Sequence, residues 1–394
     1  MNYANKLIIK KRRKINPPES IVGSSDFVFE EGPKLDFEDL WLKEISYISP
    51  YCIDDKNKRM LFAYVDKDKD LRKLHPFYYE AQRKYAKFFV GVPYDILYNL
   101  SDSLPDLDKK CIMLYSTGRC GSTFLCNLMG SINNIQSLSE PDAYSQMTLI
   151  RANSKINRDD ELIQLIKAYT KMIYHHSLSK NPEKPVVVIK LRALSLFMGE
   201  LINKALPSIS SIFLYRNAID VVNSFYGAFF DNPIMKTIKY LNIENIVLKI
   251  LRFTYSSYVK TIPLLKNEKY SDFNSFDAFK GLGFIWLSLM EYALYLHEQY
   301  PDFLDSAIDY KDLREKPLDA LKELLLACGI ETDLNQDIDN IKKVIESNSQ
   351  KGSRIASKGK RHVGNKEIEA INSILTRHDL IKSGDFLFPK TVCR

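Results

Sequence analysis

The sequence lacks long apolar stretches, and this absence limits where the chain can lie. No run of about eighteen apolar residues, the length that crosses a bilayer, occurs in the 394 residues. The first twenty residues also lack the apolar centre and small-residue cleavage site of a secretory signal, and carry the basic run Lys10–Lys14 instead. We therefore expect a cytoplasmic chain without a transmembrane segment.

Cysteine is sparse, and the cysteines lack the spacing that is typical of redox pairs and metal sites. The six cysteines include no CxxC pair and have no histidine at the distance along the chain that is typical of metal ligands. This excludes a disulfide framework and gives no support to a metal site, so we expect reduced thiols and no metal. The six are Cys52, Cys111, Cys120, Cys126, Cys328 and Cys393.

The chain also lacks a strong charge imbalance. Its formal net charge of +7 is modest for this length, and basic residues near the N-terminus supply much of it. Such a balance gives little support to nucleic-acid binding, and we expect a small-molecule partner. The oligomeric state does not follow from the sequence.

Composition along the chain predicts three parts. Residues 1–35 combine a basic cluster, a proline pair, a Gly-Ser-Ser turn and two glutamates, which is typical of a poorly ordered tail. Residues 36–107 are dense in aromatic residues interrupted by charges at helix-like intervals, which predicts a mainly helical extension. Residues 108–394 form the predicted α/β domain.

Short, continuous apolar runs in the third part predict strands that are buried on both faces of a parallel sheet. They are Cys111–Tyr115, Val186–Ile189, Ile212–Tyr215 and the weaker Ala307–Ile308. Helix-like patterns separate them, namely Leu162–Tyr174, Leu194–Leu206 and Phe284–Tyr300, and a further helix begins at Pro317. The predicted fold class is α/β, with a central parallel sheet and flanking helices.

The first strand leads into a glycine-containing loop. The segment Ser116–Thr123 follows the strand and precedes a helical pattern, an arrangement that binds anions. Its glycines let backbone N–H groups approach phosphate oxygens, while Ser122 and Thr123 add hydroxyl donors at the helix N-terminus. Arg119 supplies a permanently charged guanidinium.

Two other phosphate-binding signatures do not fit this loop. Gly-x-x-x-x-Gly-Lys-[Ser/Thr] cannot be laid on it, and clustered magnesium-binding acids are absent, which disfavours a nucleotide-dependent kinase. A cysteine-based phosphatase would place an arginine six positions after Cys120, where the chain has Cys126.

A second anion motif follows the strand Ile212–Tyr215. Arg216 leaves its carboxyl end, where open α/β sheets bind ligands, and Ser224 lies two helical turns further on. Both side chains can reach one phosphate. Asn217 and Asp220 are plausible N-terminal caps of the helix.

The two motifs together resemble those of the sulfotransferases that use 3′-phosphoadenosine 5′-phosphosulfate (PAPS), which have a P-loop NTPase-like fold. The resemblance spans roughly Ile112 to Arg361 and leaves the first hundred residues uncovered. It implies that Arg216 and Ser224 hold the 3′-phosphate of PAPS. It also implies that the 5′-phosphosulfate is held by Arg119, Cys120, Gly121, Ser122, Thr123 and Phe124.

Two weaker similarities extend the resemblance. The segment Asp309–Pro317 is similar to the family's Tyr-Glu-Asp-Leu element, which implies that Tyr310 faces the adenine. Lys351 and Gly352 resemble the basic loop that closes over the 3′-phosphate, although Lys358–Arg361 is a competing basic loop.

The chain departs from the cytosolic branch of the family at the residue that acts as general base. That branch has a histidine where this chain has Arg192, and a guanidinium stays protonated at physiological pH. Glu140 lies in a Glu-Pro element like that of carbohydrate-type and several bacterial sulfotransferases, and we predict it as the base. The resemblance places Lys190 near the transferring group.

Histidines offer alternative bases. His175 and His176 end a helical pattern, where a cation suits the helix dipole, so a structural role is favoured for both. His362 is a further candidate.

The resemblance implies an enzyme that moves a sulfuryl group from PAPS to a hydroxyl or amine of a soluble small molecule and releases adenosine 3′,5′-bisphosphate (PAP). The alternatives are a nucleotide-dependent kinase and a non-catalytic nucleotide-binding member of the fold.

Overall fold

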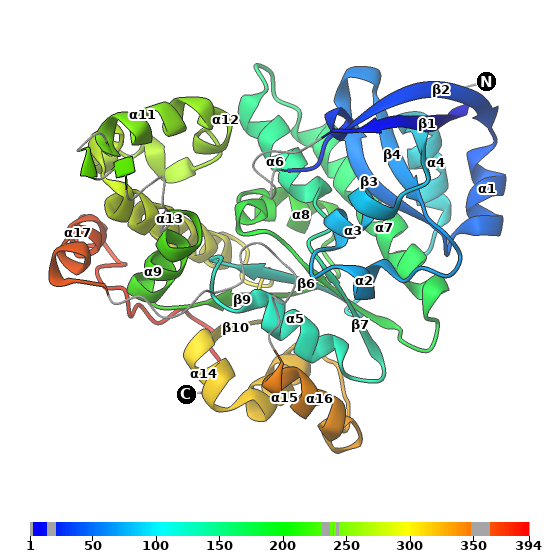
Figure 1. Ribbon diagram of the computed structural model, residues 1–394. Coiled ribbons are helices and arrows are strands. Elements are labelled where there is room, and N and C mark those ends of the chain that lie inside the picture. The colour runs from blue at the N-terminus through cyan, green and yellow to red at the C-terminus, as the bar shows by residue number, and fades with distance from the viewer. Residues whose placement is uncertain are drawn as a thin grey trace.

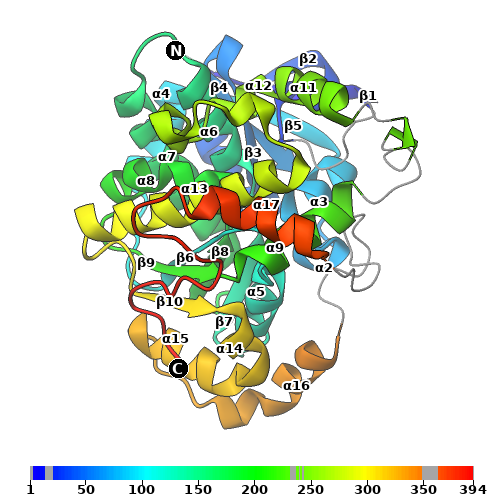
Figure 2. The ribbon, with the colours of Figure 1, turned by 90° about the vertical axis from the view of Figure 1, so that its left-hand side faces the viewer.

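The computed structural model describes residues 3–13, 21–230, 237–238, 240–241, 244–347 and 363–393, and within these ranges it holds two five-stranded sheets (Figures 1 and 2). One sheet is parallel and comes from the predicted α/β part. The other is antiparallel and comes from the first hundred residues. No helix in the described ranges is long and apolar enough to cross a bilayer.

The parallel sheet has the strand order β10-β9-β6-β8-β7. The strands are β6 (Cys111–Ser116), β7 (Ile135–Ser139), β8 (Val186–Lys190), β9 (Ser210–Tyr215) and β10 (Ser306–Asp309). All four pairings between neighbours are parallel. The predicted fold class of this part is confirmed, and β7 is an additional edge strand that its polar residues concealed in the sequence.

Alternate residues of the central strand β6 enter two different cores, because successive side chains point to opposite faces of a sheet. Ile112 and Leu114 pack with the helices on one face, whereas Met113 and Tyr115 pack with those on the other. The first face is covered by α5 (Ser122–Gly130), α14 (Tyr310–Glu315), α15 (Pro317–Ala327) and α16 (Ile338–Glu346). The second is covered by α7 (Asp159–Lys180), α8 (Gly199–Ala205), α9 (Ala218–Phe229) and α13 (Ala278–Gln299).

Local sequence signals set the ends of several of these helices. Asn217 caps α9, because its side chain accepts hydrogen bonds from the backbone N–H groups of Ile219 and Asp220. Pro317 stands at the start of α15, and Gly329 follows its end with a positive φ of 72°.

The other helices complete the shell around the two sheets. They are α1 (Phe37–Glu44), α2 (Leu71–Leu74), α3 (Tyr78–Tyr85), α4 (Tyr94–Ser103), α6 (Ala143–Asn153), α11 (Glu244–Thr254), α12 (Ser256–Val259) and α17 (Asn365–Leu375). Short 3-10 turns join them, among them Ala193–Met198 between β8 and α8. All six cysteines are buried and free of disulfides.

The N-terminal antiparallel sheet corrects the prediction for residues 1–35. Its order is β2-β1-β5-β4-β3, with β1 (Ala4–Arg12), β2 (Phe27–Leu35), β3 (Ile48–Asp54), β4 (Arg59–Tyr64) and β5 (Phe88–Pro93). The described parts of residues 1–35 are therefore mostly strands and not a poorly ordered tail, whereas residues 36–107 combine the four helices α1, α2, α3 and α4 with three strands of the sheet. The boundary at residue 108 stays a prediction.

Pairing between distant residues explains why the prediction for the tail was wrong. The basic cluster of β1 lies beside the acidic residues of β2, with Ile8 opposite Glu30 and Lys10 ion-paired to Glu30. Arg12 donates to the backbone carbonyls of Arg83 and Ala86. Each stretch alone has a tail-like composition, and the partner that neutralises it lies about twenty residues away along the chain.

Helix α7 joins the two sheets. It contacts β3 of the antiparallel sheet and β8 of the parallel sheet, and α6 also packs against β3. In Figure 1 the blue antiparallel sheet lies above the parallel sheet, on the opposite side from α14, α15 and α16. This arrangement brings α3 toward the ends of β7 and β8.

Candidate active site

The carboxyl ends of the five parallel strands carry the predicted site residues in spatial order. From one edge of the sheet to the other, β10 is followed by Tyr310, β9 by Arg216 and β6 by the glycine loop. Lys190 ends β8, and Glu140 follows β7. Residues that are up to about two hundred positions apart in the chain therefore share one edge, which is where open α/β sheets bind ligands.

The glycine loop has an unusual backbone. Gly118, Arg119 and Gly121 all have positive φ, at 74°, 51° and 83°, a conformation that favours glycine. Helix α5 starts directly afterwards at Ser122. Successive left-handed residues before a helix N-terminus turn backbone N–H groups toward one point, which suits an anion.

Two arginines from different strands converge beside this loop. The Nε of Arg119 donates to the Oγ of Ser224 at 3.0 Å, which links the first predicted phosphate motif to the second. Burial lowers the pKa of Arg119, and the nearby positive charge of Arg216 lowers it further. Arg216 also pairs with Asp220 at 2.9 Å, but that carboxylate is 55% exposed.

Tyr310, which follows β10, packs against the same cluster. The guanidinium of Arg216 lies over its ring, 4.6 Å from the centroid. The ring packs on Gly121 so closely that a β-carbon at this position would overlap it. The structure thus brings together Arg119, Arg216, Ser224, Gly121 and Tyr310, which were predicted to bind one nucleotide.

The other predicted residues of the loop point mainly into the protein. Cys120 is fully buried and its Sγ donates to the carbonyl of Leu214 at 3.4 Å. Phe124 packs in the core below the sheet, with the guanidinium of Arg314 over its ring. Ser122 and Thr123 are also buried. The side chains of Cys120 and Phe124 therefore pack in the interior of the protein.

Glu140 and Lys190 form a buried ion pair near the other edge of the sheet, at the ends of β7 and β8. Lys190 donates to the Oε1 of Glu140, and the side chains are 4% and 13% exposed, respectively. The backbone N–H of Glu140 donates to the carbonyl of Lys190 at 2.8 Å, continuing the pairing of β7 with β8. The two predicted catalytic residues therefore lie together. The ammonium of Lys190 also lies over the ring of Phe77, 5.4 Å from its centroid.

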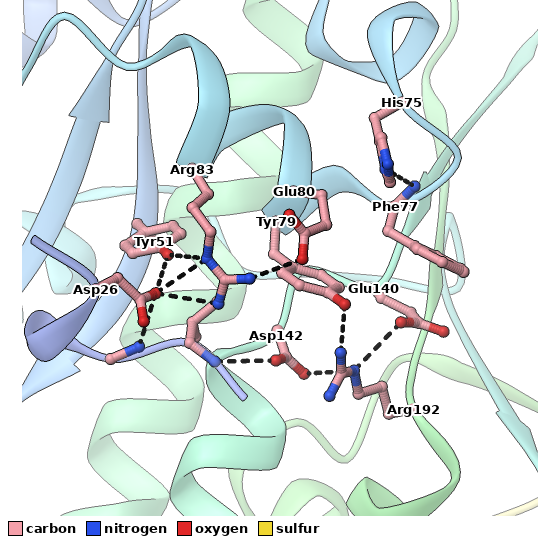
Figure 3. Close-up of polar contacts among 12 residues, drawn as sticks. Asp26, Tyr51, His75, Phe77, Tyr79, Glu80, Arg83, Glu140, Asp142 and Arg192 are labelled. Carbon is pink, nitrogen blue, oxygen red and sulfur yellow. Dashed lines mark hydrogen bonds and ion pairs between the residues drawn. The ribbon is translucent and has the colours of Figure 1, made fainter. Parts of the chain in front are cut away.

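Arg192 ties this pair to its surroundings (Figure 3). Its Nε lies 3.2 Å from the Oε2 of Glu140 and 3.2 Å from the Oδ1 of Asp142. It also donates to the phenol oxygen of Tyr79 in α3, and lies over that ring at 4.6 Å. The side chain of Asp142 is 0% exposed, and its Oδ2 accepts the backbone N–H of Val22 at 3.2 Å.

The two carboxyl groups have opposite pKa shifts. Burial acts to raise the pKa of Glu140, but the charges and hydrogen bonds of Lys190 and Arg192 outweigh it, and the pKa lies below its usual value. Burial raises the pKa of Asp142 to about 6, against the opposing effect of Arg192. Glu140 is therefore ionised at neutral pH.

The alternative histidines do not lie with this group. His176 is buried, with Nδ1 bound to the carbonyl of Ile45 at 2.7 Å and Nε2 to the hydroxyl of Tyr78 at 3.1 Å. Burial lowers its pKa to about 4. His175 contacts the carbonyl of Pro105 at 3.2 Å. Their contacts support the structural roles favoured by the sequence.

Some predicted positions lie outside the described residues. These are Lys351 and Gly352 of the predicted closing loop, the competing basic loop and His362. Three residues of the site were not assigned a role from the sequence, namely Arg192, Asp142 and Tyr79. The pattern Glu-x-Asp after one strand and Lys-x-Arg after the next was visible, but their pairing depends on the adjacency of β7 and β8.

Comparison with known proteins gives one decisive finding. The sulfotransferase domain model matches residues 109–374, which is well over half of the chain. No curated protein matches the sequence.

Three solved structures are similar to this chain at low identity. The mouse sulfotransferase SULT7A1, complexed with PAP, has 14% identity and a TM-score of 0.36, over 71% of this chain and 88% of that chain. Retinol dehydratase in complex with androsterone and PAP has 11% identity and a TM-score of 0.33, over 87% and 98%. The sulfotransferase domain of the Synechococcus PCC 7002 olefin synthase has 12% and 0.33, over 69% and 97%. These TM-scores are too low to add to the family match.

The family match agrees with the two phosphate motifs that the sequence predicted, and with their positions at the strand ends of the parallel sheet. The chain belongs to the sulfotransferase family, and it is a PAPS-dependent sulfotransferase.

Proposed function

We propose that the enzyme moves the sulfuryl group of PAPS to a hydroxyl or amine of a small-molecule acceptor, with Glu140 as general base. The observation that carries this proposal is the row of strand ends, where the cationic residues for a nucleotide lie at one end and the pair Glu140–Lys190 lies at the other.

The cluster around Arg119 suits the two phosphate-bearing positions of PAPS. Burial lowers the pKa of Arg119 and repulsion by the guanidinium of Arg216 lowers it further, and a bound phosphate would offset both effects. The positive φ angles of Gly118, Arg119 and Gly121 suit a loop whose backbone N–H groups bind an anion. Arg216 and Ser224 would hold the 3′-phosphate, while the loop holds the 5′-phosphosulfate. Tyr310 would stack on the adenine.

PAPS supplies a sulfuryl group whose bond to the bridging oxygen breaks during transfer. The acceptor oxygen or nitrogen forms the new bond to sulfur, PAP leaves with the bridging oxygen, and the acceptor's proton passes to Glu140. Lys190 would stabilise the negative charge that collects on the leaving oxygen. As Lys190 turns toward that charge it releases Oε1 of Glu140, which raises the proton affinity of the carboxylate.

Residues of the N-terminal sheet region border the place where the acceptor would lie. Figure 3 shows Phe77 beside Glu140, with His75 above it. The Nδ1 of His75 accepts the backbone N–H of Phe77 at 3.1 Å, so the neutral ring carries its proton on Nε2. In this tautomer His75 donates a hydrogen bond and does not act as a base.

Incubation with labelled PAPS and a panel of phenols, alcohols and amines tests the function. We expect at least one product heavier by one sulfuryl group, detected by mass spectrometry, together with stoichiometric PAP. Isothermal titration with PAP runs in parallel. Binding of PAP without product from any acceptor would contradict the transfer step for that panel, and absence of PAP binding would contradict the donor site as well.

A further inference from the structure

We propose that Arg192 is a positioning residue, which holds the carboxylate of Glu140 in its reactive orientation and is itself fixed by Asp142 and Tyr79. The inference rests on the proposed function, because it concerns the residue assigned there as general base. Arg192 occupies the position at which the resemblance placed a histidine base, and its guanidinium cannot accept a proton.

The orientation of Glu140 needs an external support. Its φ of 57° lies in the left-handed region, which is uncommon for a residue with a side chain, and Pro141 follows it directly. Such a backbone persists when its surroundings determine it. During transfer Lys190 turns toward the negative charge on the donor. The contact between Arg192 and the Oε2 of Glu140 then remains to hold the carboxylate.

Arg192 has little freedom to move. Asp142 lies on one side of the guanidinium, and Tyr79 provides both a hydroxyl acceptor and a ring face. The carboxylate of Asp142 is in turn held by the backbone N–H of Val22. Two carboxylates thus face the two cations Lys190 and Arg192, so the buried group is balanced in charge before any substrate arrives.

Asp142 and Tyr79, the two residues that hold Arg192, both connect it to the antiparallel sheet. Asp142 does so through Val22, which precedes β2, and Tyr79 belongs to α3. The side chains of Val22 and Tyr79 are buried in one apolar cluster with Tyr51 and Phe89. A buried network of Asp26, Tyr51 and Arg83 supports this cluster, with Arg83 donating to Asp26 at 3.1 Å. The N-terminal sheet therefore contributes to the geometry of the base as well as to the acceptor side.

A double-mutant cycle on Arg192 and Glu140 tests the inference. The rate measured is the release of sulfate from PAPS to water, which needs no identified acceptor, for wild type, Arg192→Gln, Glu140→Gln and the double variant. We expect Glu140→Gln to lower the rate about 10²- to 10⁴-fold and Arg192→Gln to lower it about 10- to 100-fold, with the double variant no slower than Glu140→Gln, because Arg192 acts through Glu140. Independent, multiplying losses would overturn the inference.

Two further measurements keep the test decisive if hydrolysis is slow or Arg192→Gln folds poorly. Tyr79→Phe removes the hydroxyl contact alone, and Arg192→Lys keeps the charge. Crystal structures of both variants with PAP should show the Glu140 carboxylate displaced from its wild-type position, with PAP affinity within about twofold. An unmoved Glu140 in both would overturn the inference. If Glu140→Gln turns over PAPS at the wild-type rate, the base assignment itself fails, which is a distinct result.

Discussion

The carboxyl ends of the parallel strands form a row of site residues, and the two ends of this row differ in how their charges are balanced. At the donor end, burial and the nearby charge of Arg216 both lower the pKa of Arg119, and the carboxylate that pairs with Arg216 is largely exposed. At the transfer end, Glu140 and Asp142 are buried against Lys190 and Arg192. The donor end is thus arranged to gain stability from an anion, whereas the transfer end is already neutral and held in place.

This difference predicts that nucleotide affinity and the rate of sulfuryl transfer depend on different residues. A substitution at the donor end should change nucleotide affinity, because it removes a charge that the ligand neutralises. A substitution at the transfer end should change the rate and leave nucleotide affinity nearly intact. Each prediction below places a substitution at one of the two ends.

The largest effect is expected from Glu140→Gln. Loss of the general base should lower the rate of sulfuryl transfer by about 10²- to 10⁴-fold, while the Kd for PAP stays within twofold. Transfer is followed with labelled PAPS, and affinity by isothermal titration. A parallel loss of PAP affinity would show that the two ends are not separate.

Arg216→Ala should act in the opposite way. A charge-assisted hydrogen bond to phosphate contributes about 1.5–3 kcal/mol, so the Kd for PAP should rise by about 10- to 100-fold. Lys311→Ala is the matched control, because Lys311 is an exposed cation that follows Tyr310 directly. If both variants bind PAP equally well, the assignment of Arg216 to the 3′-phosphate is wrong.

Gly121→Ala should distort the donor end. The left-handed φ of 83° strains any side chain, and the new methyl group would displace the ring of Tyr310, so the free energy of unfolding should fall by about 1–3 kcal/mol and PAP affinity should weaken. Gly227→Ala is the control, because nothing lies within 4 Å of a β-carbon at that position in α9. Urea denaturation measures the free energy of unfolding of both variants, and isothermal titration measures their affinity for PAP. Equal stability of the two variants would contradict the close packing at Gly121.

The last prediction concerns the pH dependence of stability that Asp142 causes. Its pKa is raised to about 6 in the folded protein from an ordinary value of 3.8, so between about pH 4 and 6 the native state binds the proton more tightly than the unfolded state. Stability from this group therefore falls as pH rises through that window, by at most about 1.4 kcal/mol per pH unit.

Asp142→Asn removes that titration. Urea midpoints measured from pH 4 to pH 7 should show a difference between variant and wild type that changes across the window and is constant above it. The lowered pKa of Glu140 acts in the opposite sense and below the window, because its contribution is lost as pH falls through the folded pKa. A difference that is constant at every pH would contradict burial of an ionisable Asp142.

The sequence predicted the donor end well because its signals are local. The strand, the glycine loop and the helix lie within twenty residues, and Arg216 and Ser224 lie on one strand end and one helix. The parallel strands β6, β8 and β9 were predicted because strands buried on both faces read as continuous apolar runs. The family match confirmed the resulting identification.

The transfer end and the N-terminal sheet depend on contacts between distant segments. The edge strand β7 has few apolar residues, so the adjacency of Glu140 to Lys190 and Arg192 could not be derived from periodicity. Strand β1 carries basic residues and strand β2 carries acidic ones, and the charge that complements each strand lies on its partner. Tyr79 and Val22 reach the site through that sheet, so their part in it was not predictable from either segment alone.

Recognition of the 3′-phosphate is the central claim about the donor end, and isothermal titration with PAP and with AMP tests it most directly. The account predicts that the wild-type enzyme binds PAP at least about tenfold more tightly than AMP, and that Arg216→Ala binds both with similar affinity. Equal affinity of the wild-type enzyme for PAP and AMP would contradict it.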